Sequence, residues 1–337
     1  MLTANVQLTL NALLREAERY GPTYGNGLSN HLPMVLIAMQ RLGASSTELE
    51  AHVQGYAKRL EPVPASDKVI SDDNLVTHLG DWSAYGALRL FFLSALERED
   101  TQATLARYWP KLMPGIASAG FHALIRLAYG LEAGHRGEIA SGLAYLASSN
   151  TPLLPSTIEL PGKAENVAQA LNSIHRAFAG RTIEANLIIE ELQLATEEPD
   201  FFAALLTPPL ASKSDQDRTL ADMAHQAIRI YLGQPNFNSL HLVTGTHALA
   251  VVLPHLPEPL HAESLFYFWV AFCAGYVTVG APAAVEPAPS ESQEWATITK
   301  TVCRNGHDHA IKLVYTCHSG FLKTQDPAYL AAAMRLV

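Results

Sequence analysis

Histidine is the residue type in this chain that offers the most chemistry. Fourteen of the 337 residues are histidine, which is the commonest metal ligand in proteins and the usual proton-transfer group near neutral pH. His241 and His247 stand among leucine and alanine residues, where burial of an imidazole without a partner would be costly. We therefore predict that both are ligands of a buried metal ion.

The spacing of these two histidines sets a condition on the metal site. Six residues of ideal helix rotate by roughly 600°, which leaves the two rings about 120° apart. They can reach one ion only if His241 lies at the start of the helix or if the helix bends near Gly245.

A second apolar segment, residues 121–131, carries three polar residues on one helical face. Arg126 and Tyr129 follow His122 at i+4 and i+7, and residues at these spacings are neighbours on a helix. One interpretation of His122 is a histidine hydrogen-bonded within the core. We instead predict that the three polar residues line a cavity, in which His122 is a metal ligand and Arg126 and Tyr129 act in catalysis. An arginine there would suit an anionic phenolate or superoxide.

Lys312 is surrounded by apolar residues three positions after His309. A buried lysine loses its proton easily, and a neutral amine can take up CO2 to become a carbamate, an anionic oxygen ligand. We predict that Lys312 is such a ligand and that His309 orients it. The alternative is a solvated turn in which Asp308 and Lys312 form a surface pair.

Helical periodicity recurs along almost the whole chain, so the sequence predicts an all-α protein. We expect one large domain, residues 1–337, with buried central helices and little or no sheet. Two helical halves joined near 150–162 are the alternative. Proline-rich segments at 151–161, 207–215 and 281–290 predict surface connections.

Residues 265–285 contain no charged side chain and are long enough to cross a bilayer. The flanking residues, Glu263 and Glu286, are acidic rather than basic, so the usual orientation signal of a membrane helix is missing. An interior helix of a large α-protein has the same composition, and that is the prediction.

The composition of the chain argues against two classes of binding partner. The net charge is −9 without a block of like charges, which argues against nucleic acid and against anionic membranes as partners. The three cysteines form no C-x-x-C pair, so a reducing cytoplasm is expected. The sequence contains no G-x-G-x-x-G or Walker motif, so NADPH or flavin use has no motif to support it.

Four segments together resemble the questin oxidase-like family. They are YGNGLSNHLPM at 24–34, GFHALIRLAYG at 120–130, HLVTGTHAL at 241–249 and DHAIKL at 308–313. The first of them contains His31, which follows a glycine-rich segment and opens an apolar stretch. His31 either caps a helix or binds the metal, and the resemblance favours the ligand.

The resemblance implies an oxygenase that opens a ring of a polycyclic aromatic polyketide, such as an anthraquinone, with O2. It also implies non-haem iron held by histidines, with a carbamylated lysine. The predicted ligands are His31, His122, His241, His247 and Lys312. Two alternatives stay open, because the same histidines could hold a hydrolytic zinc ion or could be packing residues of a helical scaffold.

Overall fold

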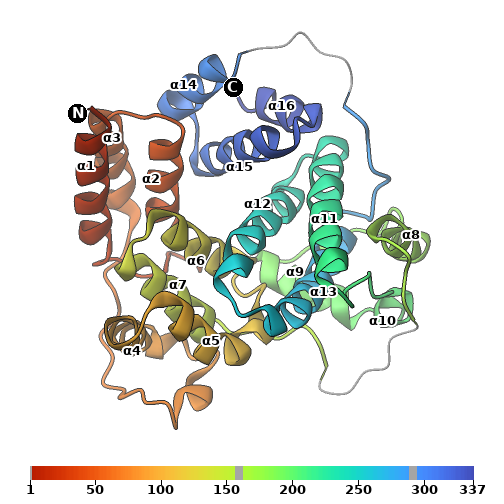
Figure 1. The fold of residues 1–337 in the computed structure, drawn as a ribbon, viewed down its shortest axis with the longest axis horizontal. Coiled ribbons are helices and arrows are strands. Elements are labelled where there is room, and N and C mark those ends of the chain that lie inside the picture. The colour runs from red at the N-terminus through yellow and green to blue at the C-terminus, as the bar shows by residue number, and fades with distance from the viewer. Residues whose placement is uncertain (1, 156–161, 288–293) are drawn as a thin grey trace.

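The computed structural model describes residues 2–155, 162–287 and 294–337 (Figure 1). This part of the chain is 69% helical, with sixteen α-helices and a single two-stranded sheet. The prediction of an all-α protein is therefore confirmed.

The helices of the N-terminal part are α1 (Leu2–Ala17), α2 (Leu32–Arg41), α3 (Ser46–Tyr56), α4 (Tyr85–Arg98), α5 (Thr101–Leu112), α6 (His122–Ala133) and α7 (Arg136–Ser148). Those that follow are α8 (Val167–Phe178), α9 (Ile188–Glu197), α10 (Phe201–Ala204), α11 (Lys213–Gly233), α12 (Phe237–Val252), α13 (His261–Thr278), α14 (Trp295–Asn305), α15 (Asp308–Thr324) and α16 (Pro327–Met334). The sheet is a short hairpin of β1 (Thr23–Tyr24) and β2 (Leu28–Ser29).

Helices from distant parts of the sequence share one hydrophobic core. In Figure 1 the C-terminal α15 lies across the top of the molecule, close to the N-terminal α2, and the two are in contact. α12 packs against both α6 and α15. The core therefore joins helices on both sides of residues 156–161, which lie outside the described residues.

The uncharged segment at 265–285 forms an interior helix over most of its length. α13 begins at His261, and its residues from Phe268 to Thr278 are all buried. The predicted extent is wrong at its end, because the helix stops at Thr278 and the chain turns at Gly280 and Ala281, both with positive φ. None of the helices in the described ranges has the length and apolarity needed to cross a membrane.

The loop predicted at 207–215 is also too long. α11 begins at Lys213, where Ser212 and Asp215 form a reciprocal capping box. The first turns of this helix are polar, so the apolar period that marks a helix in the sequence starts several residues late. Residues 151–155 and 281–287 are irregular, as predicted, whereas 156–161 and 288–290 lie outside the described residues.

Glycine allows α6 and α7 to approach closely. A Cβ atom added at Gly142 would lie 2.5 Å from the Cα atom of Leu127, a distance that real Cβ atoms do not tolerate. The two helices are further joined by a buried ion pair between Arg126 and Glu138. This packing fixes α6, which carries His122.

We predict that Gly142→Ala destabilises the fold by about 1–3 kcal/mol, because the new methyl group meets backbone that cannot move aside. Gly55→Ala is the matched control, since Gly55 lies inside α3 with open space around it. It should stabilise the protein by about 0.5–1 kcal/mol. Denaturant unfolding measures both free energies, and equal stability of the two variants would contradict the packing.

Candidate metal centre

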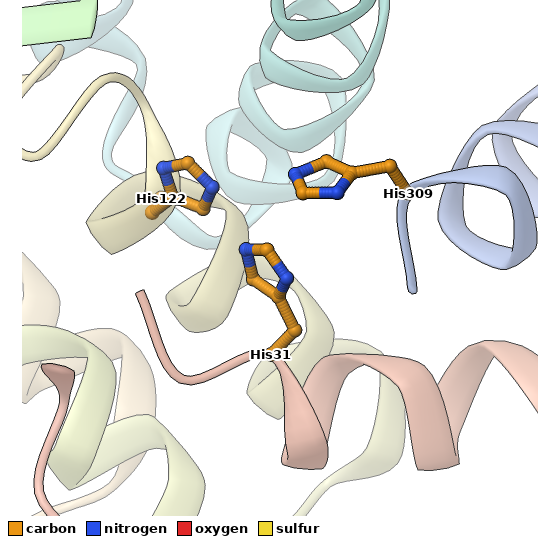
Figure 2. Close-up of side chains that lie close together, drawn as sticks. All are labelled: His31, His122 and His309. Carbon is orange, nitrogen blue, oxygen red and sulfur yellow. The ribbon is translucent and has the colours of Figure 1, made fainter. Parts of the chain in front are cut away.

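Four helices each place one histidine near their N-terminal end, and the four side chains meet. His31 is the N-cap residue of α2, and His122 is the first residue of α6. His241 lies in the second turn of α12, and His309 is the second residue of α15. Figure 2 shows the rings of His31, His122 and His309 pointing toward one another from three separate helices.

Three of the four histidines form a group whose ring nitrogens could hold one ion, and His241 adjoins that group through His122. Ligand atoms of His31, His122 and His309 lie within 4.8 Å of one another. The Nε2 atom of His241 lies 3.1 Å from that of His122. The ring of His241 is also 5.4 Å from that of His309, measured between centroids. Two bonds of about 2.0–2.1 Å to one metal ion hold their nitrogens at most about 4.2 Å apart, so the 3.1 Å pair already has the spacing of bound ligands and the wider group would have to close slightly on an ion.

Two of the rings are oriented by backbone carbonyl groups. Nδ1 of His122 lies 2.7 Å from the Ala119 carbonyl oxygen, and Nδ1 of His241 lies 2.6 Å from that of Phe237. A carbonyl oxygen only accepts, so each Nδ1 carries the proton and each neutral ring presents a lone pair at Nε2. These two lone pairs face each other at 3.1 Å, an arrangement that a metal cation between them would make favourable.

His31 has a carboxylate near its Nδ1 atom in place of a carbonyl. Nδ1 lies 3.5 Å from a carboxylate oxygen of Asp308, too far for a close hydrogen bond, and its Nε2 is buried without a hydrogen-bond partner among the described residues. Metal-binding histidines usually donate the second ring N–H to a carboxylate or a carbonyl, and Asp308 is the carboxylate available to His31. The histidines present therefore fit a metal ion.

The environment keeps the rings uncharged. Burial lowers the pKa of His122 well below its ordinary value, and the neighbouring histidines and Lys312 lower it further. The pKa of His241 falls to about 3, chiefly through burial and then through Lys312. Neutral imidazole is the form that binds metals.

Lys312 lies in the same buried region. Its side chain is fully buried, and Nζ has no hydrogen-bond partner among the described residues. Burial lowers the pKa of Lys312 to about 7, although Asp308 acts in the opposite direction. A substantial fraction of this amine is therefore uncharged at neutral pH.

The backbone before His122 is strained. Ala119, Gly120 and Phe121 have φ values of 54°, 63° and 68°, in the left-handed region that non-glycine residues rarely adopt. Strain of this kind persists only where the surrounding structure holds it. Here it brings the Ala119 carbonyl oxygen next to Nδ1 of His122, so the tight turn also determines the orientation of the imidazole.

His247 does not lie with the four clustered histidines, although it was predicted to be a ligand in the same site. It lies 3.6 Å from a carboxylate oxygen of Glu132, and its ring contacts that of Tyr315. α12 runs unbroken from Phe237 to Val252, so His241 and His247 face different directions, and the bend proposed at Gly245 is absent. Gly245 instead makes room for the ring of Phe121, which a Cβ atom there would approach to 3.1 Å.

The predicted catalytic residues also lie differently from expectation. The guanidinium of Arg126 donates two hydrogen bonds to Glu138, so it is not free to hold an anionic substrate. Tyr129 lies beside Tyr315, two turns along α6 from the histidines. His309, expected only to orient a carbamate, offers a ligand atom itself. No pattern in the sequence distinguishes the two roles, since a histidine three residues before the lysine can serve either purpose.

We predict that His122→Phe and His241→Phe each weaken metal binding at least ~100-fold, a loss larger than the 10–100-fold typical of residues that only support a ligand. His247→Phe is the control and should bind metal as the unmodified protein does. Titration of metal-free protein with Co2+, followed by absorbance, gives the affinities. Equal affinity in all three variants would show that the histidine cluster is not the metal site.

Comparison with known proteins agrees with the resemblance seen in the sequence. A match to "Baeyer-Villiger monooxygenase AacuH" of Aspergillus aculeatus (strain ATCC 16872 / CBS 172.66 / WB 5094) has 30% identity over 132 residues. That match covers 35% of this chain and 28% of the fungal protein. The model of the family described as Questin oxidase-like matches residues 28–317 and so includes all four clustered histidines and Lys312. The chain therefore belongs to the questin oxidase-like family.

Proposed function

We propose that this protein is a non-haem iron oxygenase that opens a ring of a polycyclic aromatic phenol, such as an anthraquinone, with O2. Family membership and the relative described as a Baeyer-Villiger monooxygenase support an oxygenase. The main observation in favour of a bound metal ion is that the Nε2 lone pairs of His122 and His241 face each other at 3.1 Å.

His31, His122, His241 and His309 would hold the ion, with Lys312 as a fifth ligand. The chemistry that iron supplies when bound is one-electron redox change, which lets O2 react with an organic molecule, whereas zinc is redox-silent. Imidazole suits iron, zinc and copper alike. The choice of iron therefore comes from the family, and the choice of site comes from the geometry.

Lys312 would act as a carbamate. The uncharged amine adds to the carbon of CO2 and loses one proton, which gives an N-carboxylate. This change replaces a buried cation, which would repel a metal ion, by an anionic oxygen ligand. The full burial of Lys312, its lack of a hydrogen-bond partner and its pKa of about 7 all favour the reaction.

The surroundings suit a planar, anionic substrate. The N-terminal ends of α2, α6 and α15 converge on the histidines, and each such end carries a partial positive charge of about +0.5, which favours a phenolate. Phe237 is 58% exposed, and its ring lies 4.6 Å from that of His309. An aromatic substrate entering from solvent could stack on Phe237 beside the cluster.

We propose that both atoms of O2 enter the opened product. The ring carbon–carbon double bond that breaks becomes two carbonyl groups, and its four electrons reduce O2, so no separate reductant is consumed. The role of the chain in this step is to hold the phenolate against the cluster. The buried apolar residues behind it, such as Leu32 and Leu124, exclude water from the reacting atoms.

Elemental analysis of tag-free protein, combined with an oxygen electrode and a hydroxyanthraquinone, tests this function. We expect about one iron per chain and O2 uptake that requires the anthraquinone, with both 18O atoms of 18O2 in the product. Stoichiometric zinc with hydrolysis in the absence of O2 would contradict the proposal and favour a zinc hydrolase.

We also predict that Lys312→Ala lowers the bound metal and that added bicarbonate does not restore it, because no amine remains to be carbamylated. Lys300→Ala is the control, since Lys300 is an exposed residue of α14. In the unmodified protein, incubation with 13C-bicarbonate should give a carbamate signal by NMR that is missing from the Lys312 variant. Unchanged metal content in that variant would leave a histidine-only site.

A further inference from the structure

A second group of buried polar residues lies further along the helices that carry the histidines. The Tyr315 hydroxyl donates to a carboxylate oxygen of Glu132 at 2.7 Å. The same oxygen lies 3.6 Å from Nε2 of His247. The ring of Tyr129 lies 5.6 Å from that of Tyr315. Glu132 and Tyr129 belong to α6, His247 to α12 and Tyr315 to α15.

This group continues directly from the candidate metal centre. Tyr315 and Thr316 follow Lys312 at i+3 and i+4 in α15, so they share its helical face, with Cβ atoms about 5–6 Å from one to the next. Tyr129 follows His122 at i+7 in α6. The three helices therefore run side by side from the histidines to Glu132, with polar side chains at both levels.

Exposure rises steadily along this group of residues. Lys312 is fully buried, and Tyr129 and Thr316 are 2% and 3% exposed. Tyr315 is 8% exposed, and the side chain of Glu132 is 15% exposed. Glu132 lies near the C-terminal end of α6, where its carbonyl group accepts a hydrogen bond from exposed Arg41. The group therefore reaches from the fully buried amine to the protein surface.

Two polar atoms at the ends of this line have no hydrogen-bond partner among the described residues, Nζ of Lys312 and the second carboxylate oxygen of Glu132. Between them, the hydroxyl groups of Tyr129 and Thr316 interact with each other, and Nε2 of His247 interacts with Glu132. Buried polar groups in folded proteins nearly always pair, with ordered water where no protein group is in reach. The polar atoms therefore follow one another from the buried amine to Glu132, and ordered water is the expected partner of the two that are left unpaired.

The charges suit proton transfer. Burial acts to raise the pKa of Glu132, but His247, Tyr315 and Arg41 together lower it below its ordinary value. Burial and the neighbouring Glu132 carboxylate raise the pKa of Tyr315. At neutral pH a carboxylate therefore accepts from a tyrosine hydroxyl, with the imidazole of His247 beside it.

We propose that Glu132, His247 and Tyr315 form a proton relay that connects the buried histidine site to solvent. A proton arriving from the inner side binds the Tyr315 oxygen as the hydroxyl proton of Tyr315 passes to Glu132. Tyr315 is unchanged by the exchange, and Glu132 releases its proton to His247 or to water. The use of the relay in turnover rests on the proposed function, because deprotonation of a phenol in a closed site leaves a proton to be removed.

Hydrogen exchange at Nζ of Lys312 tests the connection without any substrate. In zinc-loaded protein the exchanging group is the carbamate N–H of Lys312, which is observed by 15N NMR and assigned by its absence from Lys312→Ala. Glu132→Gln keeps the shape of the carboxylate but cannot take up the proton, and Tyr315→Phe removes the hydroxyl. Both should slow this exchange about tenfold or more, whereas backbone amide exchange in α6 and α15 should not change.

Tyr108→Phe is the matched control. The Tyr108 hydroxyl also donates to a carboxylate at 2.7 Å, that of Asp72, in a pair remote in sequence from the cluster. Its loss should leave exchange at Lys312 unchanged. Equal exchange rates in the unmodified protein, Glu132→Gln and Tyr315→Phe would overturn the relay, and so would equal slowing in all three variants.

Measurement of catalytic turnover provides a second test of the relay. With an active preparation, Glu132→Gln should lower kcat about tenfold or more with little change in KM or metal content, and the pH dependence of kcat should change. Formate should restore part of kcat to Glu132→Ala. A protein without oxygenase activity would refute the proposed function, and the exchange rates would still decide the relay.

Discussion

The contact between the Nε2 atoms of His122 and His241 is the constraint on which the account of this protein depends. Two carbonyl groups fix the protons on the opposite ring nitrogens, so two lone pairs are held 3.1 Å apart. Protonation of one ring would relieve the repulsion between the two lone pairs, but burial disfavours the protonated form of both histidines. The cation proposed between the rings would turn this repulsion into attraction, because both lone pairs would then point at a positive charge.

The fold that brings these two rings together contains strained backbone. Three consecutive residues before His122 adopt left-handed backbone conformations, and strain of this kind is worth of order 1–3 kcal/mol for each non-glycine residue. Gly142 lets α7 approach α6 closely, and Gly245 lets α12 approach the ring of Phe121. The close helix packing, the tight turn and the ring orientation therefore act together, and a histidine is positioned by helices that are far apart in the sequence.

Much of the fold follows from local pattern, because apolar periodicity and proline-rich segments depend on neighbouring residues. The pattern misplaced the start of α11, where the polar first turns hid a helix that Ser212 caps. The clustering of His31, His122 and His241 was predicted with the help of four family-like segments. His247 was misassigned because an apolar flank shows that a histidine is buried but not which way it points. In the unbroken α12 it lies beside Glu132 and Tyr315 instead.

The pairing of Glu132 with Tyr315 could not be predicted in the same way. The two residues are separated by 183 positions, and neither lies in a pattern that indicates chemistry. Arg126 shows the converse, since its place on the face of His122 is as expected, but Glu138 of α7 occupies its guanidinium. Contacts between helices, which periodicity does not encode, decide both cases.

The most direct test of the central claim is the electron density between His122 and His241, with anomalous diffraction recorded on both sides of the iron absorption edge. We expect one iron atom about 2.0–2.2 Å from each Nε2 atom, with His31, His309 and a carbamylated Lys312 as further ligands. A crystal of metal-loaded protein in which the two rings remain 3.1 Å apart, joined by an N–H···N hydrogen bond with no anomalous scatterer between them, would contradict it.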